Sequence, residues 1–253
     1  MTQLERSFEV KGRPQLEVTI PAGHVVIRED SSVTITVTGS DRALDAIEIE
    51  QFGSMVSVRM TRSGRRMFMR NTDVSVGLPA GADILIKTGS GDVEIGVAIN
   101  DLEVKVGSGD VRVSAPVADA LIKSASGHIV VDQVGMAQVT AASGDIRIDK
   151  ANRDVVASTA SGDVVLGSFD RDATLKSASG DLSVGVVDGD ELNAKTMSGN
   201  IRIGLPTGLS VDATLQSYSG SIRNELEPAD GDVTRSARIR AKTLSGDIVL
   251  RSA

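Results

Sequence analysis

Serine and aspartate recur together along this chain, and both residue types can take part in catalysis. Ser-Gly followed by a polar residue occurs nine times after residue 89. The nine serines are Ser90, Ser108, Ser126, Ser143, Ser161, Ser179, Ser198, Ser219 and Ser245. A nucleophilic serine needs a neighbouring base and a strained elbow that exposes its hydroxyl. Because nine serines share one setting, the pattern indicates a structural repeat.

The two histidines occupy the same repeat position, two residues after the serine, where most copies have Asp. His128 follows Ser126, and His24 follows Ala22, which stands in the serine's place in an earlier copy. Catalysis by histidine would need a partner nucleophile or carboxylate in a shared cleft, whereas the repeat already explains both as turn residues. The chain has no Cys and one Asp in most repeats, so we expect no metal site, no cofactor and no enzymatic activity.

An arginine-rich stretch is the strongest candidate for recognition. Between residues 59 and 70 the chain has five arginines and no acidic residue, although its net charge is −7. Such a local inversion of sign can steer an anionic partner, and neighbouring Met and Phe could add apolar contact. The alternative is an exposed hairpin tip with solvated arginines. The candidate partner-binding residues are Arg59, Arg62, Arg65, Arg66, Arg70, Met67, Phe68 and Met69.

The elements that carry these residues follow from the spacing of the serines. Successive serines are 18, 18, 17, 18, 18, 19, 21 and 26 residues apart. Residues six and four before the serine and three after it are aliphatic in every copy. This alternation predicts one strand before each Ser-Gly pair and one after it. We call the residues at one repeat position in successive copies a column. Residues of one column lie next to each other only when the copies stack in parallel, so the sequence predicts an all-β fold, a parallel β-solenoid.

The predicted solenoid is a single-stranded β-helix with about 18 residues per turn, and the general crossover rule favours a right-handed coil. Two outward columns carry charge. We expect these columns to pair with each other, because stacked like charges repel. The lysines, three before the serine, are Lys87, Lys105, Lys123, Lys176, Lys195 and Lys242; the aspartates, two after it, are Asp92, Asp110, Asp145, Asp163, Asp181 and Asp247.

The domain organisation has two predicted parts. Residues 1–83 form an N-terminal β cap with a first repeat-like turn near residue 15, followed by strands at 33–37, 47–49, 56–58 and 74–78. Residues 84–253 form a β-solenoid of nine repeats. We expect residues 248–253 to lie at its open end and residues 224–237 to form an acidic surface loop.

Three features carry a family resemblance: the serial Ser-Gly-Asp turns, the Leu-Pro-x-Gly turns at Leu78–Gly81 and Leu205–Gly208, and the closing stretch at 241–248. With these motifs the chain resembles the bacterial putative-adhesin β-strand-repeat family, a domain family of unknown function. The resemblance covers nearly the whole chain. It implies the solenoid architecture and an adhesin-like role, and it implies no catalytic residue.

Composition disfavours several classes of partner and ligand. The acidic net charge disfavours nucleic acid as a partner, and 2% aromatic residues disfavour a sugar-binding platform. No apolar run could span a bilayer and no secretion signal opens the chain, so we expect a cytoplasmic protein without a transmembrane segment. The sequence predicts a non-enzymatic scaffold or interaction (adhesin-like) module, a monomer or homodimer, with an unknown protein or anionic surface as partner. The alternatives are a self-assembling structural protein that forms dimers or filaments through its ends, and a polysaccharide-acting β-helix enzyme.

Overall fold

The computed structural model describes residues 2–61, 72–226 and 235–253. The chain divides into two compact units, and the division in the sequence falls between Gly127 and His128. The described elements are β-strands apart from one short helix, α1 (Asp41–Leu44), which confirms the all-β class. No helix in these three ranges is long and apolar enough to cross a membrane. The predicted boundary at residue 83 stays a prediction.

The first unit consists of strands that alternate between buried and exposed residues. Their bounds are β1 (Thr2–Phe8), β2 (Gln15–Ala22), β3 (Val25–Glu29), β4 (Val33–Gly39), β5 (Ile47–Phe52), β6 (Met55–Met60), β7 (Asp73–Leu78), β8 (Ala82–Ser90), β9 (Val93–Gly96), β10 (Ile99–Ser108), β11 (Val111–Val113) and β12 (Val117–Ser126). We call a strand that enters a corner, together with the strand that pairs on the other side of that corner, a coil, and we name it by its two strands or by its corner serine.

Coils in the first unit stack column on column, as predicted. Strand β10 pairs in parallel with β8 and with β12, and Ser108 is opposite Ser90 on one side and Ser126 on the other. The aliphatic columns point inward, so that Ile86, Val104 and Ile122 are all fully buried. Parallel pairing places each residue on its own column, which lets small β-branched side chains fill the interior.

The N-terminal strands depart from the predicted order. The coil β2–β3 pairs in parallel with β8–β9, as its Ala22-for-serine pattern predicts, and on its other side with β6–β7. The strands at 56–58 and 74–78 therefore pair in parallel with the first repeat-like coil, within the region predicted as the cap. The antiparallel strands are β1, β4 and β5, since β1 pairs with β4, β4 with β7, and β5 with β6.

The second unit contains only strands among its described residues. Their bounds are β13 (Ile129–Ser143), β14 (Ile146–Ala151), β15 (Val155–Ser161), β16 (Val164–Phe169), β17 (Asp172–Ser179), β18 (Leu182–Val187), β19 (Glu191–Ser198), β20 (Ile201–Leu205), β21 (Leu209–Ser219), β22 (Ile222–Glu225), β23 (Arg235–Ser245) and β24 (Ile248–Ser252). Within this unit the strands before the corners pair with one another, and so do the strands after them.

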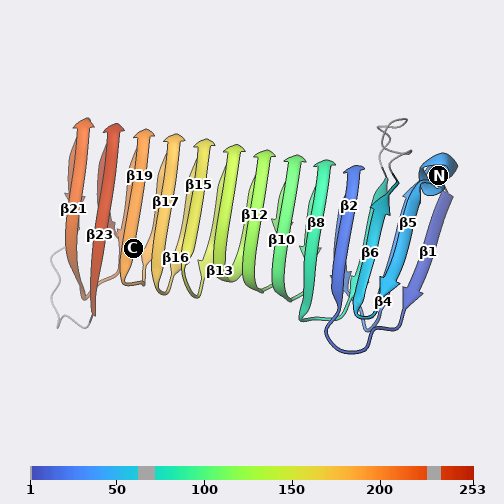
Figure 1. Ribbon diagram of the computed structural model, residues 1–253. Helices are drawn as coiled ribbons and strands as arrows, with labels where there is room; N and C mark the ends of the chain where they lie inside the picture. The colour runs from blue at the N-terminus through green and yellow to red at the C-terminus, as the bar shows by residue number, and fades with distance from the viewer. Residues whose placement is uncertain (1, 62–71, 227–234) are drawn as a thin grey trace. The chain divides into compact units, whose positions relative to one another are not determined.

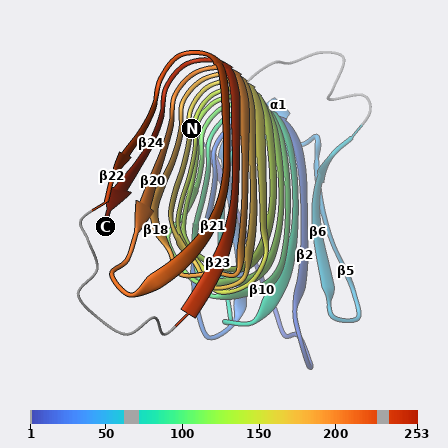
Figure 2. The ribbon, with the colours of Figure 1, turned by 90° about the vertical axis from the view of Figure 1, so that its left-hand side faces the viewer.

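The last two coils of the second unit exchange places relative to their order in the sequence. Strand β23 pairs with β19 on one side and with β21 on the other, and β24 lies likewise between β20 and β22. In Figure 1 the red β23 separates the orange β19 and β21. Figure 2 shows β21 and β23 on one side of the coil and β20, β22 and β24 on the other. The outermost coil is therefore β21–β22, and the prediction that 248–253 forms the open end was wrong.

Candidate functional site: the Ser-Gly-Asp corners

Each corner is closed by a glycine with a positive φ angle. The angle is 124° at Gly144, 142° at Gly162 and 151° at Gly180. The peptide N–H of most corner glycines donates to the serine carbonyl of an adjacent coil; Gly162, for example, donates to Ser179 over 2.9 Å. A side chain would be strained at such a φ angle, so the predicted geometric role of this glycine is confirmed.

A column of buried or half-buried hydroxyl side chains supports the corners from inside. These Thr and Ser residues stand two positions before the corner serine, and each donates to a glycine carbonyl of a neighbouring coil over 2.8–3.3 Å: Thr159 to Gly144, Ser177 to Gly162, Thr196 to Gly180, Ser217 to Gly246 and Thr243 to Gly199. This column was not predicted from the sequence. Strand alternation alone could have found it, because it shares the inward face with the aliphatic columns.

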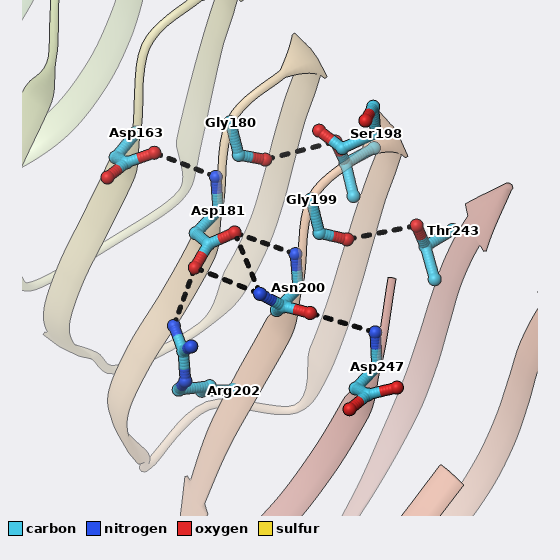
Figure 3. A network of polar contacts seen from close by, with 10 residues as sticks. Asp163, Gly180, Asp181, Ser198, Gly199, Asn200, Arg202, Thr243 and Asp247 are labelled. Carbon is cyan, nitrogen blue, oxygen red and sulfur yellow. Dashed lines mark hydrogen bonds and ion pairs between the residues drawn. The ribbon is translucent and has the colours of Figure 1, made fainter. Parts of the chain in front are cut away.

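The aspartate column forms a second ladder at the same corners. The Asp163 carboxylate accepts the peptide N–H of Asp181 over 2.8 Å, Asp181 accepts that of Asn200 over 2.8 Å, and the Asn200 amide oxygen accepts that of Asp247 over 2.9 Å. Figure 3 shows this chain of contacts, with the Thr243 hydroxyl on the Gly199 carbonyl beside it. The ladder therefore ties each coil to the next through side chain and backbone.

The predicted pairing of the lysine and aspartate columns was wrong. The aspartates accept backbone N–H groups, and Lys105 pairs with Glu103 on its own strand. The hydrogen bond from Lys105 lowers the pKa of the Glu103 carboxyl against the effect of desolvation, and the charges of Lys105, Lys87 and Lys123 lower it further. Like charges can stack in the aspartate column because each carboxylate receives a donor from the adjacent coil.

The Asp181 carboxylate accepts hydrogen bonds from several donors at once. Burial disfavours its charged form, but the N–H of Asn200, the Arg202 guanidinium and the Asn200 amide donate to it and together hold the pKa of its carboxyl below the ordinary value. The Arg202 Nη1 to Asp181 Oδ2 distance is 2.8 Å. Ionised Asp181 thus stabilises the coil that follows it.

This arrangement predicts a pH dependence of stability. Because the folded-state pKa of Asp181 is below its unfolded value, its contribution is present above the unfolded pKa and is lost as the pH falls through the folded pKa. An amide at this position keeps the acceptor for Asn200 and loses the pairing with Arg202. We expect Asp181→Asn to lower the free energy of unfolding by about 1 kcal/mol at pH 7 and to weaken its decline under acid. Urea midpoints at pH 7 and pH 3 measure both effects, and an unchanged slope with pH would contradict the assignment.

The two histidines sit in this ladder, as their repeat position predicted. His24 donates its peptide N–H to the Asp73 carboxylate over 3.1 Å, and its Nδ1 lies 3.4 Å from Asp92 Oδ2. The His128 Nδ1 accepts the peptide N–H of Asp145 over 3.4 Å. Both side chains are exposed. Their contacts match those of the aspartates at the equivalent corners.

The arginine-rich stretch is only partly described. Arg59 lies on β6 and its guanidinium is 2.6 Å from the Glu17 carboxylate of β2, so it links two neighbouring strands. The remaining candidate partner-binding residues, Arg62, Arg65, Arg66, Arg70, Met67, Phe68 and Met69, lie outside the described residues. Their role stays a prediction.

The corner chemistry is structural in character. Carboxylates, hydroxyls and peptide groups satisfy one another from coil to coil, and the same contacts repeat at successive corners. In the described ranges no group of three or more His, Asp or Glu side chains is placed to hold a metal ion. These repeated contacts between coils fix the backbone and give it a regular outer surface.

Comparison with known proteins identifies the architecture. The model of a family described as Toastrack DUF4097 matches residues 14–251. A search of curated proteins finds no match.

Solved structures of low sequence identity resemble the chain along its length. A putative adhesin from Bacteroides fragilis is 13% identical with a TM-score of 0.53, over 98% of this chain and 97% of that one. A putative lipid binding protein from Parabacteroides distasonis is 15% identical with a TM-score of 0.49, over 98% and 96%. The likeness to the first of these shows a shared fold.

Proposed function

Since the chain belongs to the Toastrack DUF4097 family, we propose that it is a non-enzymatic, adhesin-like interaction module built on a solenoid scaffold. One observation carries this proposal: the corner Asp carboxylates and the His128 Nδ1 accept peptide N–H groups of the adjacent coil, and the hydroxyls two positions before the corner serine donate to glycine carbonyls, so these groups hold coils together. A surface fixed in this way suits the display of side chains to a partner. The adhesin name of the similar Bacteroides fragilis protein agrees with such a role.

The finer architecture that we propose is a single-stranded, right-handed parallel β-helix. Its support is the parallel register, in which serine meets serine in neighbouring coils about 18 residues apart. Right-handed crossover between parallel strands is the general rule. A solenoid of this kind would carry equivalent outward positions at a spacing of about 4.8 Å.

The proposed partner is an anionic surface or an anionic protein, and the proposed docking segment is the arginine-rich stretch from Arg59 to Arg70. Five positive charges within twelve residues stand against an acidic chain. Such a segment attracts an anionic partner at low ionic strength and releases it as salt screens the charges.

Removal of the charge tests this function. We expect the variant with Arg62, Arg65, Arg66 and Arg70 changed to Ser to lose at least about tenfold in affinity for phosphatidylcholine vesicles that contain phosphatidylglycerol, since each cation near an anionic surface contributes about 1 kcal/mol. Vesicle co-sedimentation measures the loss. Wild-type binding should weaken between low and physiological salt.

The matched control changes four exposed arginines elsewhere: Arg112, Arg147, Arg153 and Arg251 to Ser. This variant has the same net charge as the test variant and keeps the stretch intact. Equal losses in the two variants would mean that vesicles sense net charge alone. Undiminished binding by the test variant would refute the docking segment.

A further inference from the structure

On one side of the outermost coil of the second unit, no described strand pairs with it. Among the described strands, β21 pairs with β23 alone and β22 pairs with β24 alone. Strand β21 is 11 residues long, so a long row of peptide groups on its other edge faces no described strand. Such an edge is a template for another β-strand.

Two aliphatic columns of the interior coils continue into this coil. In the column three after the serine, Ile201 and Ile248 are fully buried, whereas Ile222 of the outermost coil is 47% exposed. Six before the serine, Ile239 is buried and Ala213 is exposed. A terminal repeat that faces water normally has polar residues on its outer side. The retained aliphatic columns therefore fit a coil on which another coil stacks.

We propose that this coil binds the same coil of a second copy of the chain, through a two-fold axis that makes β21 and β22 antiparallel to their counterparts. A row of unpaired peptide groups is matched along its length by the backbone of another β-strand, and a lipid or a small ligand offers no such row. A contact between two identical ends is isologous, and rotation about a two-fold axis that crosses the strands reverses their direction. The inference is independent of the proposed docking of an anionic partner.

The charges of β22 are self-complementary in this arrangement. Arg223 and Glu225 are both exposed and lie on either side of Asn224. An axis at Asn224 places Arg223 of each copy opposite Glu225 of the other, which forms two cross-strand ion pairs. It also places the two Asn224 side chains opposite each other, where their amides can pair.

Asn224 is the residue that breaks its column. Five positions after the serine the other coils have aliphatic side chains, such as Ile148, Leu166 and Leu250, which are buried. Asn224 is exposed. A polar residue is tolerated in this column where one side of the coil is open. At the proposed two-fold axis, Asn224 would lie opposite Asn224 of the second copy.

Charge reversal tests the contact in the full chain. We expect the wild-type protein to form dimers in a concentration series followed by light scattering and sedimentation velocity. Glu225→Arg and Arg223→Glu should each raise the dissociation constant by about tenfold, because two attractive pairs become repulsive. The double variant Arg223→Glu with Glu225→Arg should restore it. Since Arg223 lies 3.6 Å from Asp247 of its own chain, Glu225→Arg is the cleaner single change.

Two controls make the outcome decisive. Arg147→Glu alters the net charge of an exposed strand position in another coil and should leave dimerisation unchanged. Thermal melting by circular dichroism verifies that each variant is folded. A chain that is monomeric up to about 100 µM, dimers indifferent to both reversals, or open filaments in negative stain would overturn the proposal. A monomer whose end coil binds vesicles, with binding lost in Ile222→Lys, would assign this surface to lipid.

Discussion

Replacing Ile146 by Asp will unfold the unit that contains it. Ile146 begins β14, is fully buried, and is opposite Ile129 on one side and Val164 on the other. An aspartate there would place a carboxylate between aliphatic side chains without a donor. We expect the free energy of unfolding to fall by about 4 kcal/mol or more, measured as the urea midpoint by circular dichroism.

The adjacent residue supplies the control. Arg147 points outward, is exposed, and pairs with Asp149 over 2.7 Å. Loss of a solvated ion pair of this kind costs little, so Arg147→Ala should be within about 0.5 kcal/mol of the wild type. Equal midpoints for the two variants would show that β14 has the opposite register.

The column pattern predicted the strands and their parallel stacking because alternation fixes which face is buried. Ile86, Val104 and Ile122 occupy one column in the sequence and lie on neighbouring strands in the structure. A shift by one residue would expose every aliphatic side chain, so register is strongly determined. The corner glycines were predictable because the chain must turn there between two strands, where a positive φ angle favours glycine.

The order of the coils could not be predicted by the same argument. Nearly every coil has the same columns. The Ser198 coil can therefore pair with the Ser245 coil as readily as with the Ser219 coil, which is the next one in the sequence. The wider spacings of 21 and 26 residues gave the chain enough length for either order. Asn224 was the available signal, because a break in an aliphatic column is least costly in the outermost coil.

The polar ladders were only partly predictable. Opposite charge suggested that the lysine and aspartate columns pair, whereas the aspartates accept backbone N–H groups one coil away. Sequence spacing locates the side chain but does not identify the peptide group that faces it across the stack. The hydroxyl column that includes Thr159 and Ser177 was missed because a small polar residue on a buried face resembles a neutral filler until its acceptor is known.

Two features of the corner favour glycine: the positive φ angle and the close approach of the adjacent coil. A pair of substitutions compares their contributions. Gly109 has φ of 131°, and a Cβ atom there would lie 2.6 Å from the carbonyl carbon of Gly91 in the adjacent coil. Gly81 has φ of 82° in the turn before β8, and a Cβ atom there would meet nothing within 4 Å. Both residues belong to the first unit, so their variants can be compared directly.

Gly81→Ala should cost about 1 kcal/mol, since it introduces backbone strain at a positive φ without a collision. Gly109→Ala should cost about 3 kcal/mol or more, because the new methyl group meets backbone that cannot move without separating two paired coils. Urea denaturation of both variants against the wild type measures the difference. If the two losses are equal, φ strain alone explains the glycine and the close stacking of corners contributes nothing; if Gly109→Ala loses more, the approach of neighbouring coils is what excludes a side chain from the Ser-Gly-Asp corner.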